Sequence, residues 1–125
     1  MKTMLLALLI SGCAQTIHWT ANVTEVAALG SLACDAGSTH DALTYGGGRF
    51  YETNPIMGAQ PTTNQQVAYF GGVTAGLVGI NYAFTKGQNH VAGDVWRILA
   101  NVLVTGVEYY AVKANTDVGV PLCGI

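Results

Sequence analysis

The feature that most constrains this chain is a long interval without charge, since no Asp, Glu, Lys or Arg occurs between Glu52 and Lys86. Its central part, "VAYFGGVTAGLVGINYAF", approaches the roughly 20 residues that a bilayer-spanning helix needs. Over the whole chain only 10% of residues are charged, against about 25% in ordinary soluble proteins. A surface in contact with water normally carries more charge than this. The sequence therefore predicts a membrane-embedded protein.

Several classes of function are disfavoured by composition and by missing motifs. A chain of 125 residues is one domain. Its net charge of −2 and scattered Lys and Arg residues give no basic patch, so nucleic acid is not an expected partner. No Gly-x-Ser-x-Gly, His-Glu-x-x-His, Gly-x-x-x-x-Gly-Lys or Cys-x-x-Cys pattern occurs. His18, His40 and His90 lie on separate segments without zinc-site spacing. We expect no enzyme, no metal and no cofactor.

The N-terminus has the pattern of an export signal. Lys2 supplies a positive start, the apolar run 4–10 follows, and small residues precede Cys13. The stretch Ile10-Ser11-Gly12-Cys13 resembles the lipobox of bacterial lipoproteins, a family in which the cysteine is acylated and becomes the first mature residue. The resemblance implies a signal peptide over 1–12 and lipidation of Cys13. The alternatives are an ordinary signal peptide, or an uncleaved first helix in which Cys13 is only a small hydrophobe.

The remaining residues, 13–125, are predicted to form one all-α domain, a small bundle of about three helices. Asn22 and Glu25 have capping-box spacing, so a first helix is expected over 22–45, ending at the triple glycine 46–48. After Pro61, overlapping Thr-x-x-Gln patterns predict a second helix over 62–85. A third is expected over 94–113, because the Asp94 charge suits a helix N-terminus.

Two cysteines, Cys34 and Cys123, could pair in an oxidising compartment. However, Cys34 falls inside an apolar helical stretch, where an inert buried thiol is common. We therefore expect no disulfide.

Small residues recur along the second predicted helix. Ala68, Gly72 and Gly76 are spaced by four, so they share one helix face. Such a face lets another helix approach closely in a membrane. We predict that it packs against a neighbouring helix, the alternative being that glycine is simply frequent in membrane helices.

Polar side chains inside these apolar segments form the candidate site. On the first helix, Asp35 and Thr39 belong to one polar stripe that also contains Ser31, Ser38 and Ala42. Glu52 and Asn54 lie in the following connector, Asn81 lies late in the second helix, and Glu108 lies on the third. An ionisable group at membrane depth costs about 3 kcal/mol, so it must face a partner, a cavity or water.

Two interpretations of these polar residues stand. In the functional one, Asp35, Glu52 and Glu108 meet, balanced by Arg49 or a bound cation, and bind an ion or pass a proton. In the structural one, which we favour, Asp35 and Glu52 cap helices and lock the first two helices together.

One further pattern joins the first helix to the connector. Asp35-x-x-x-Thr39 is followed by "ETNPIMG" at 52–58 and then by Pro61. This order resembles small hypothetical proteins of bacterial and phage genomes with an Asp-x-x-x-Thr helix and an E-T-N-P-I/L-L-G connector, although Met57 replaces the usual leucine. The resemblance implies a short helical membrane protein and carries no established activity.

Taken together, these patterns predict a non-enzymatic protein of the bacterial cell envelope with a structural or interaction role. We expect it in the inner membrane, anchored by a lipid on Cys13 and contacting membrane lipid, with a membrane-protein partner or a second copy on the glycine face. If the gene belongs to a phage or prophage, the expected role is to modify the host surface. The alternative function is a small transport or ion-binding component that uses intramembrane carboxylates.

Overall fold

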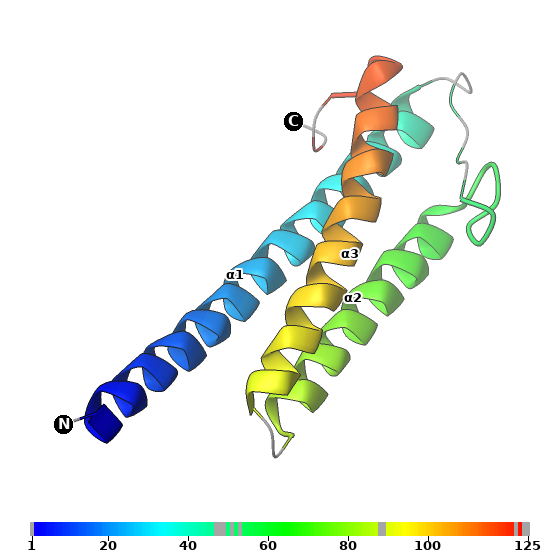
Figure 1. Ribbon diagram of the computed structural model, residues 1–125. Helices are drawn as coiled ribbons and strands as arrows, with labels where there is room; N and C mark the ends of the chain where they lie inside the picture. Colours follow the sequence, from blue (N-terminus) through cyan, green and yellow to red (C-terminus); the bar gives the residue numbers. More distant parts are fainter. Residues whose placement is uncertain are drawn as a thin grey trace.

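The computed structural model describes residues 2–46, 50, 52, 54–87, 90–121 and 123, with side chains from Gly12 onward. Its elements are three helices, α1 (Lys2–Tyr45), α2 (Thr63–Thr85) and α3 (His90–Asp117), and the described residues contain no strand. The predicted all-α three-helix bundle is confirmed. The helices run up, down and up, so that α1 and α3 are parallel and α2 is antiparallel to both (Figure 1).

The start of α2 follows the local sequence. Thr62 is the N-cap, its hydroxyl accepts from the Gln65 backbone N–H at 3.3 Å, and Gln65 Oε1 accepts from the Thr62 N–H at 2.8 Å. This reciprocal capping box confirms the predicted start of the second helix. The overlapping pattern of Thr63 and Gln66 is not used, because Gln66 turns inward and donates to the Pro61 carbonyl.

The predicted start of the first helix near Asn22 is wrong, because α1 is continuous from Lys2. Asn22 and Glu25 do not form a capping box; both accept hydrogen bonds from Arg97 of α3. Its end agrees with prediction, since the helix stops at Tyr45, beside the glycines. In Figure 1 the N-terminal part of α1 extends beyond the other two helices.

The third helix also begins earlier than expected, at His90 rather than near Asp94, and it ends at Asp117 rather than near 113. Asp94 is buried instead of lying at an exposed helix start. Gly93 permits this arrangement, because a Cβ on it would collide with the backbone carbonyl of Phe84 at the end of α2. The turn between α2 and α3 therefore requires a residue without a side chain there.

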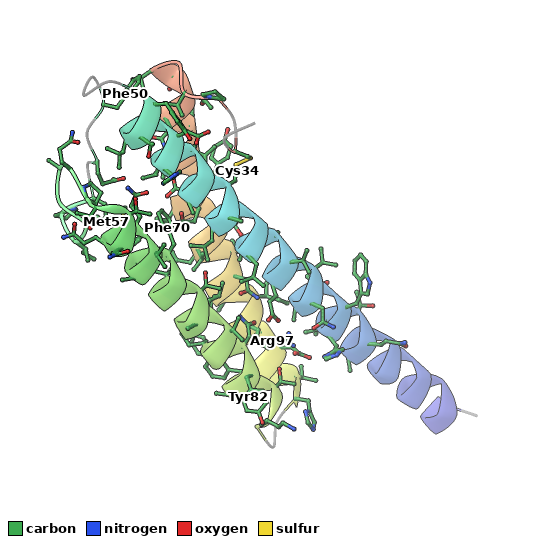
Figure 2. All side chains as sticks on the ribbon, turned by 180° about the vertical axis from the view of Figure 1, so that it is seen from behind. Cys34, Phe50, Met57, Phe70, Tyr82 and Arg97 are labelled. Atoms are coloured by element: carbon green, nitrogen blue, oxygen red, sulfur yellow. A yellow bond between two sulfur atoms is a disulfide. The ribbon has the colours of Figure 1, made fainter. Side chains whose placement is uncertain are left out.

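The apolar core is small and includes one connector residue. Ala28 and Leu32 of α1 pack with Phe70 and Leu77 of α2, and Met57 is buried in the same cluster (Figure 2). The Asn54 carbonyl accepts from the backbone N–H groups of residues 57 and 58, which forms the turn that carries Met57 inward. The connector thus fastens α1 to α2 through Met57 and not, as the structural interpretation expected, through helix caps by Asp35 and Glu52.

The distribution of the remaining side chains is inverted relative to a water-soluble bundle. Nine polar or charged residues are buried in the described part of the chain, equal to the nine buried apolar ones. Large apolar residues on α2 and α3 are exposed instead, namely Val67, Val78, Ile80, Phe84, Val95, Trp96, Leu99, Val102, Leu103 and Val107. By length and composition, α2 is the one helix in the described residues that is apolar enough to cross a membrane.

A disulfide joins Cys34 of α1 to Cys123 beyond the end of α3, across 89 positions of sequence. Our expectation of no disulfide is therefore wrong. The chain after α3 turns back, with the Val120 N–H donating to the Asn115 carbonyl at 3.0 Å, and Val120 is buried. This return brings Cys123 to a helix that is far away in sequence, which local patterning could not indicate. Cys13 is exposed and unpaired.

Counting thiols tests this arrangement directly. When the denatured, unreduced protein is treated with an alkylating reagent, we expect one label, on Cys13, and three labels after reduction. Acylation of Cys13 would remove one label from each count. Three labels before reduction, measured by intact mass, would contradict the disulfide. In that case the unreduced Cys34→Ser variant should carry two labels, one fewer than the unreduced wild type.

Candidate functional site

Two clusters of buried polar residues lie along the inner face of α3, separated by the apolar core. The arginine cluster surrounds Arg97 at the end of the bundle near the α2–α3 turn. The carboxyl cluster surrounds Asp35 and Glu108 toward the other end. Both are built by the same helical spacing, because the buried polar residues of α3 are Asp94, Arg97, Asn101 and Glu108.

The arginine cluster joins all three helices. Arg97 is only 3% exposed (Figure 2). Its Nη1 donates to Asp94 at 2.7 Å, and its Nη2 donates to Glu25 at 2.7 Å and to Asn22 at 2.9 Å. Its Nε donates to the side-chain oxygen of Asn81 on α2 at 3.2 Å. One cation thus faces two carboxylates, and each arm of the guanidinium has a partner.

Two neighbouring contacts extend this cluster. Asn81 and Asn101 exchange amide hydrogen bonds of 2.9 and 3.0 Å between α2 and α3, with both side chains buried. The second carboxylate oxygen of Asp94 lies 2.9 Å from Nδ1 of His18, which is itself largely exposed. Among the described residues, every buried side-chain nitrogen and oxygen has a hydrogen-bond partner. The cluster is therefore a closed network.

The carboxyl cluster contains most of the predicted site residues. Asp35 and Glu108 are 7% and 6% exposed, and their carboxyl groups lie near enough, between α1 and α3, for each to act electrostatically on the other. Two buried carboxyl groups this close disfavour a second negative charge, so the pair is suited to holding a proton. Thr39 donates to Asp35 at 3.4 Å. The predicted polar stripe therefore does face the bundle interior, with its carboxylate at the centre.

Asn115 of α3 completes the contact with this stripe. Its amide nitrogen lies 3.0 Å from the Ser38 hydroxyl and 3.4 Å from oxygens of both Asp35 and Thr39. Glu52 lies near enough for its charge to act on Asp35. Its own Oε1 accepts from the Asn54 backbone N–H at 2.7 Å.

The structure thus brings Asp35, Thr39 and Glu108 together, with Glu52 close by. Asn54 does not join them through its hydrogen bonds, which all stay within the connector. Arg49, the predicted counter-charge, lies outside the described residues. No group of three or more His, Cys, Asp or Glu side chains in the described part could hold a metal ion. This pair is suited to holding a proton.

Ala68, Gly72 and Gly76 lie on an exposed face of α2. A Cβ added at Gly72 or Gly76 would meet nothing within 4 Å. These residues therefore do not pack against α1 or α3, and their predicted role as a helix-packing face can only concern another molecule.

Sequence reasoning missed Arg97, Asn101 and Asn115 as site residues. A usable signal was present, because positions 94, 97, 101 and 108 of α3 recur at three-, four- and seven-residue intervals. Polar residues with helical periodicity in an otherwise apolar helix mark its inner face.

We predict that Arg97→Met strongly destabilises the bundle, because it leaves the buried carboxylate of Asp94 and the half-buried one of Glu25 without their cation. Removing one partner from a buried ion pair costs about 3–5 kcal/mol. The matched control is Lys113→Met, whose ammonium pairs with Asp117 at the exposed surface. Unfolding of both variants in detergent by increasing dodecyl sulfate measures the difference. Equal stability of the two variants would show that the arginine cluster does not hold the helices together.

Comparison of the chain with protein-family models, with curated proteins and with solved structures gives no match. The likeness to small phage and bacterial proteins, and to the lipobox, therefore stays a prediction from the sequence.

Proposed function

We propose that this protein is a membrane-embedded helical bundle of the bacterial cell envelope that acts by binding another membrane helix, and that it is not an enzyme. The observation that carries the proposal is the inverted distribution of side chains. Arg97, Asp35 and Glu108 are buried, while Trp96, Leu103 and similar residues are exposed. Surrounded by lipid, the exposed apolar face would be solvated, and the inner polar groups would find their partners only within the bundle.

The aromatic residues support this embedding. Trp96 lies near the start of α3 and Tyr109 and Tyr110 lie near its other end, and all three are exposed. Aromatic residues at both ends of a helix are typical of the two membrane interfaces. The inner membrane is the proposed location, because a helical span such as α2 is characteristic of it. Lipidation of Cys13 is part of this proposal, supported by its exposure and by the lipobox resemblance.

The outer face of α2 is the proposed surface for the partner helix. In lipid, small residues favour association because they allow two backbones to approach closely. Ala68, Gly72 and Gly76 provide such a face, and α1 and α3 leave it uncovered. The partner is a second copy of this chain or another membrane protein. For a phage-borne gene, binding a host membrane protein would alter the host surface.

We expect Gly72→Ile and Gly76→Ile to weaken self-association or partner capture in membranes at least tenfold, because a branched side chain keeps the two helix backbones apart. Energy transfer between donor- and acceptor-labelled copies in lipid vesicles measures self-association, and cross-linking in native membranes measures capture. Neither substitution should disturb the bundle itself, since a Cβ at these positions meets nothing.

Gly106→Ile is the matched control, because Gly106 lies on α3 and is equally open. Wild type and variants should all remain in the membrane pellet after alkaline carbonate extraction. Release by carbonate would overturn the embedding. Retention with unchanged association in the α2 variants would overturn only the proposed surface.

A second candidate function is proton binding in a small transport component, favoured by the buried, neighbouring carboxyl groups of Asp35 and Glu108. The pair joins α1 to α3, so gain or loss of its proton would change how these helices meet. It ranks second because the same pair can simply hold α1 against α3. Asn115 and Thr39, which hydrogen-bond to Asp35, have such a structural role beside it.

The infrared spectrum of the membrane-embedded protein tests this second candidate. We expect a protonated-carboxyl stretch at neutral pH that disappears in Asp35→Asn/Glu108→Gln, since those amides can keep a hydrogen bond without a titratable proton. Asp117→Asn, at an exposed position, should leave the band unchanged. A wild-type spectrum without this band would exclude a proton-holding pair.

A further inference from the structure

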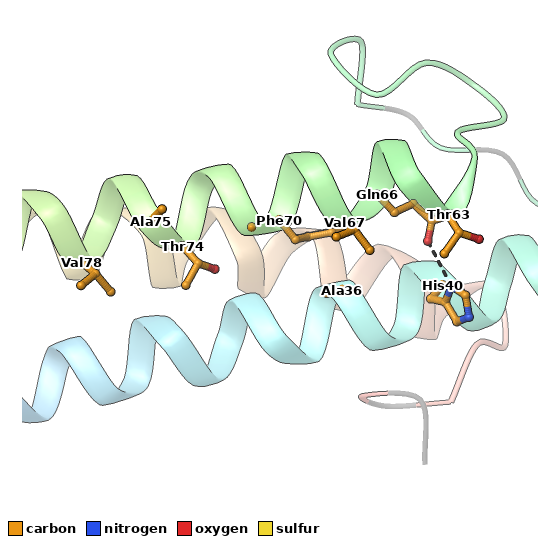
Figure 3. A pocket seen from close by; sticks show the side chains of 10 residues that line it. Ala36, His40, Thr63, Gln66, Val67, Phe70, Thr74, Ala75 and Val78 are labelled. Atoms are coloured by element: carbon orange, nitrogen blue, oxygen red, sulfur yellow. Dashed lines mark hydrogen bonds between the residues drawn. The ribbon is translucent and has the colours of Figure 1, made fainter.

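A groove of about 590 Å³ lies between α1 and α2, on the side of α2 that faces α1 (Figure 3). Its volume falls within the range of about 300–1,000 Å³ typical of small-molecule sites. It exists because α1 and α2 touch less than either helix touches α3. No residue of the two clusters described above lines this groove, so it is separate from them.

One end of the groove is polar. His40 Nδ1 lies 3.2 Å from the side-chain oxygen of Gln66, and the Gln66 nitrogen donates to the Pro61 carbonyl at 3.1 Å. The amide oxygen is an acceptor, so Nδ1 carries the proton and Nε2 is an acceptor in the neutral ring. Thr63 adds a hydroxyl at the same end (Figure 3). These groups lie at the first turn of α2, where the proposed span begins.

Apart from the hydroxyl of Thr74, the residues that line the rest of the groove are apolar, and several are small. Gly71 and Ala75 of α2 and Ala36 of α1 are among the residues that line it, and their small size leaves space there. From Val67 to Val78 the groove follows eleven residue steps of helix, or about 16 Å. That length is close to half of the roughly 30 Å hydrocarbon thickness of a bilayer. With α2 as the membrane span proposed above, the groove would start at one interface and run the depth of one leaflet.

We propose that this groove binds one acyl chain of a membrane phospholipid, with the polar part of the lipid beside His40 and Thr63. The pattern of polarity matches that ligand, because a lipid has hydrogen-bonding groups at one end of an apolar chain of leaflet length. A second helix would not need a polar end on the groove. The proposal rests on the membrane embedding proposed above, but not on the outer face of α2, since Gly72 and Gly76 do not line the groove.

Photo-cross-linking in vesicles tests the proposal with a phosphatidylethanolamine that carries a diazirine in its acyl chain. In wild type, mapping by mass spectrometry should place cross-links on the groove segments, around Ala36 and between Val67 and Val78. Gly71→Leu should lower these cross-links at least fivefold by filling the groove. A Cβ at this position meets nothing within 4 Å, so the variant is expected to fold.

The matched control is Gly79→Leu, the same change on the same helix at an equally open position that does not line the groove. It should leave the groove cross-links unchanged. Ala75→Phe, a second filling variant, should repeat the loss seen with Gly71→Leu. Cross-links spread evenly over exposed apolar positions and insensitive to both filling variants would overturn the proposal. Release of wild type by carbonate would instead overturn the embedding.

Discussion

The arrangement of the three helices depends on the guanidinium of Arg97. Its hydrogen bonds reach Asn22 and Glu25 on α1 and Asn81 on α2, while Asp94 holds it on its own helix. A planar group with several donors in fixed directions accepts few alternative geometries. A buried cation without partners would be very costly, so any rotation or slide of one helix is penalised. The apolar core alone, with few large side chains, would specify this register less strictly.

The same interaction explains why the exterior is apolar. Once α3 turns Asp94, Arg97, Asn101 and Glu108 inward, helical periodicity directs residues such as Leu99, Leu103 and Val107 outward. In water, that surface would favour aggregation. In lipid it is the expected surface, while the inner polar groups are satisfied by one another. The buried polar clusters and the proposed membrane location are thus linked, because the helix periodicity that buries the polar residues also exposes the apolar ones to the surroundings.

Features set by neighbouring residues were predictable, and those set by distant residues were not. The capping box at Thr62 and the end of α1 beside Gly46 follow from local chemistry. The inward face of Asp35 and Thr39 followed from spacing along one helix. By contrast, Asn22 and Glu25 had valid capping spacing, but Arg97, more than seventy positions away in sequence, binds their side chains. Pairing of Cys34 with Cys123 likewise depends on where the returning chain ends, which no local pattern contains.

The position of the disulfide also constrains the orientation of the bundle. Cys13 and Cys34 lie on one continuous helix, 21 residues and so about 31 Å apart, close to the hydrocarbon thickness of a bilayer. If α1 crosses the membrane along its axis, the two cysteines lie toward opposite sides. Disulfides persist in oxidising compartments, which places the Cys34 end outside the cytoplasm. Acylation of the lipoprotein type would instead place Cys13 outside. If α1 crosses the membrane, the disulfide and the lipid would therefore require opposite orientations, so the proposed lipidation of Cys13 is compatible with the disulfide only where α1 does not cross and α2 is the span.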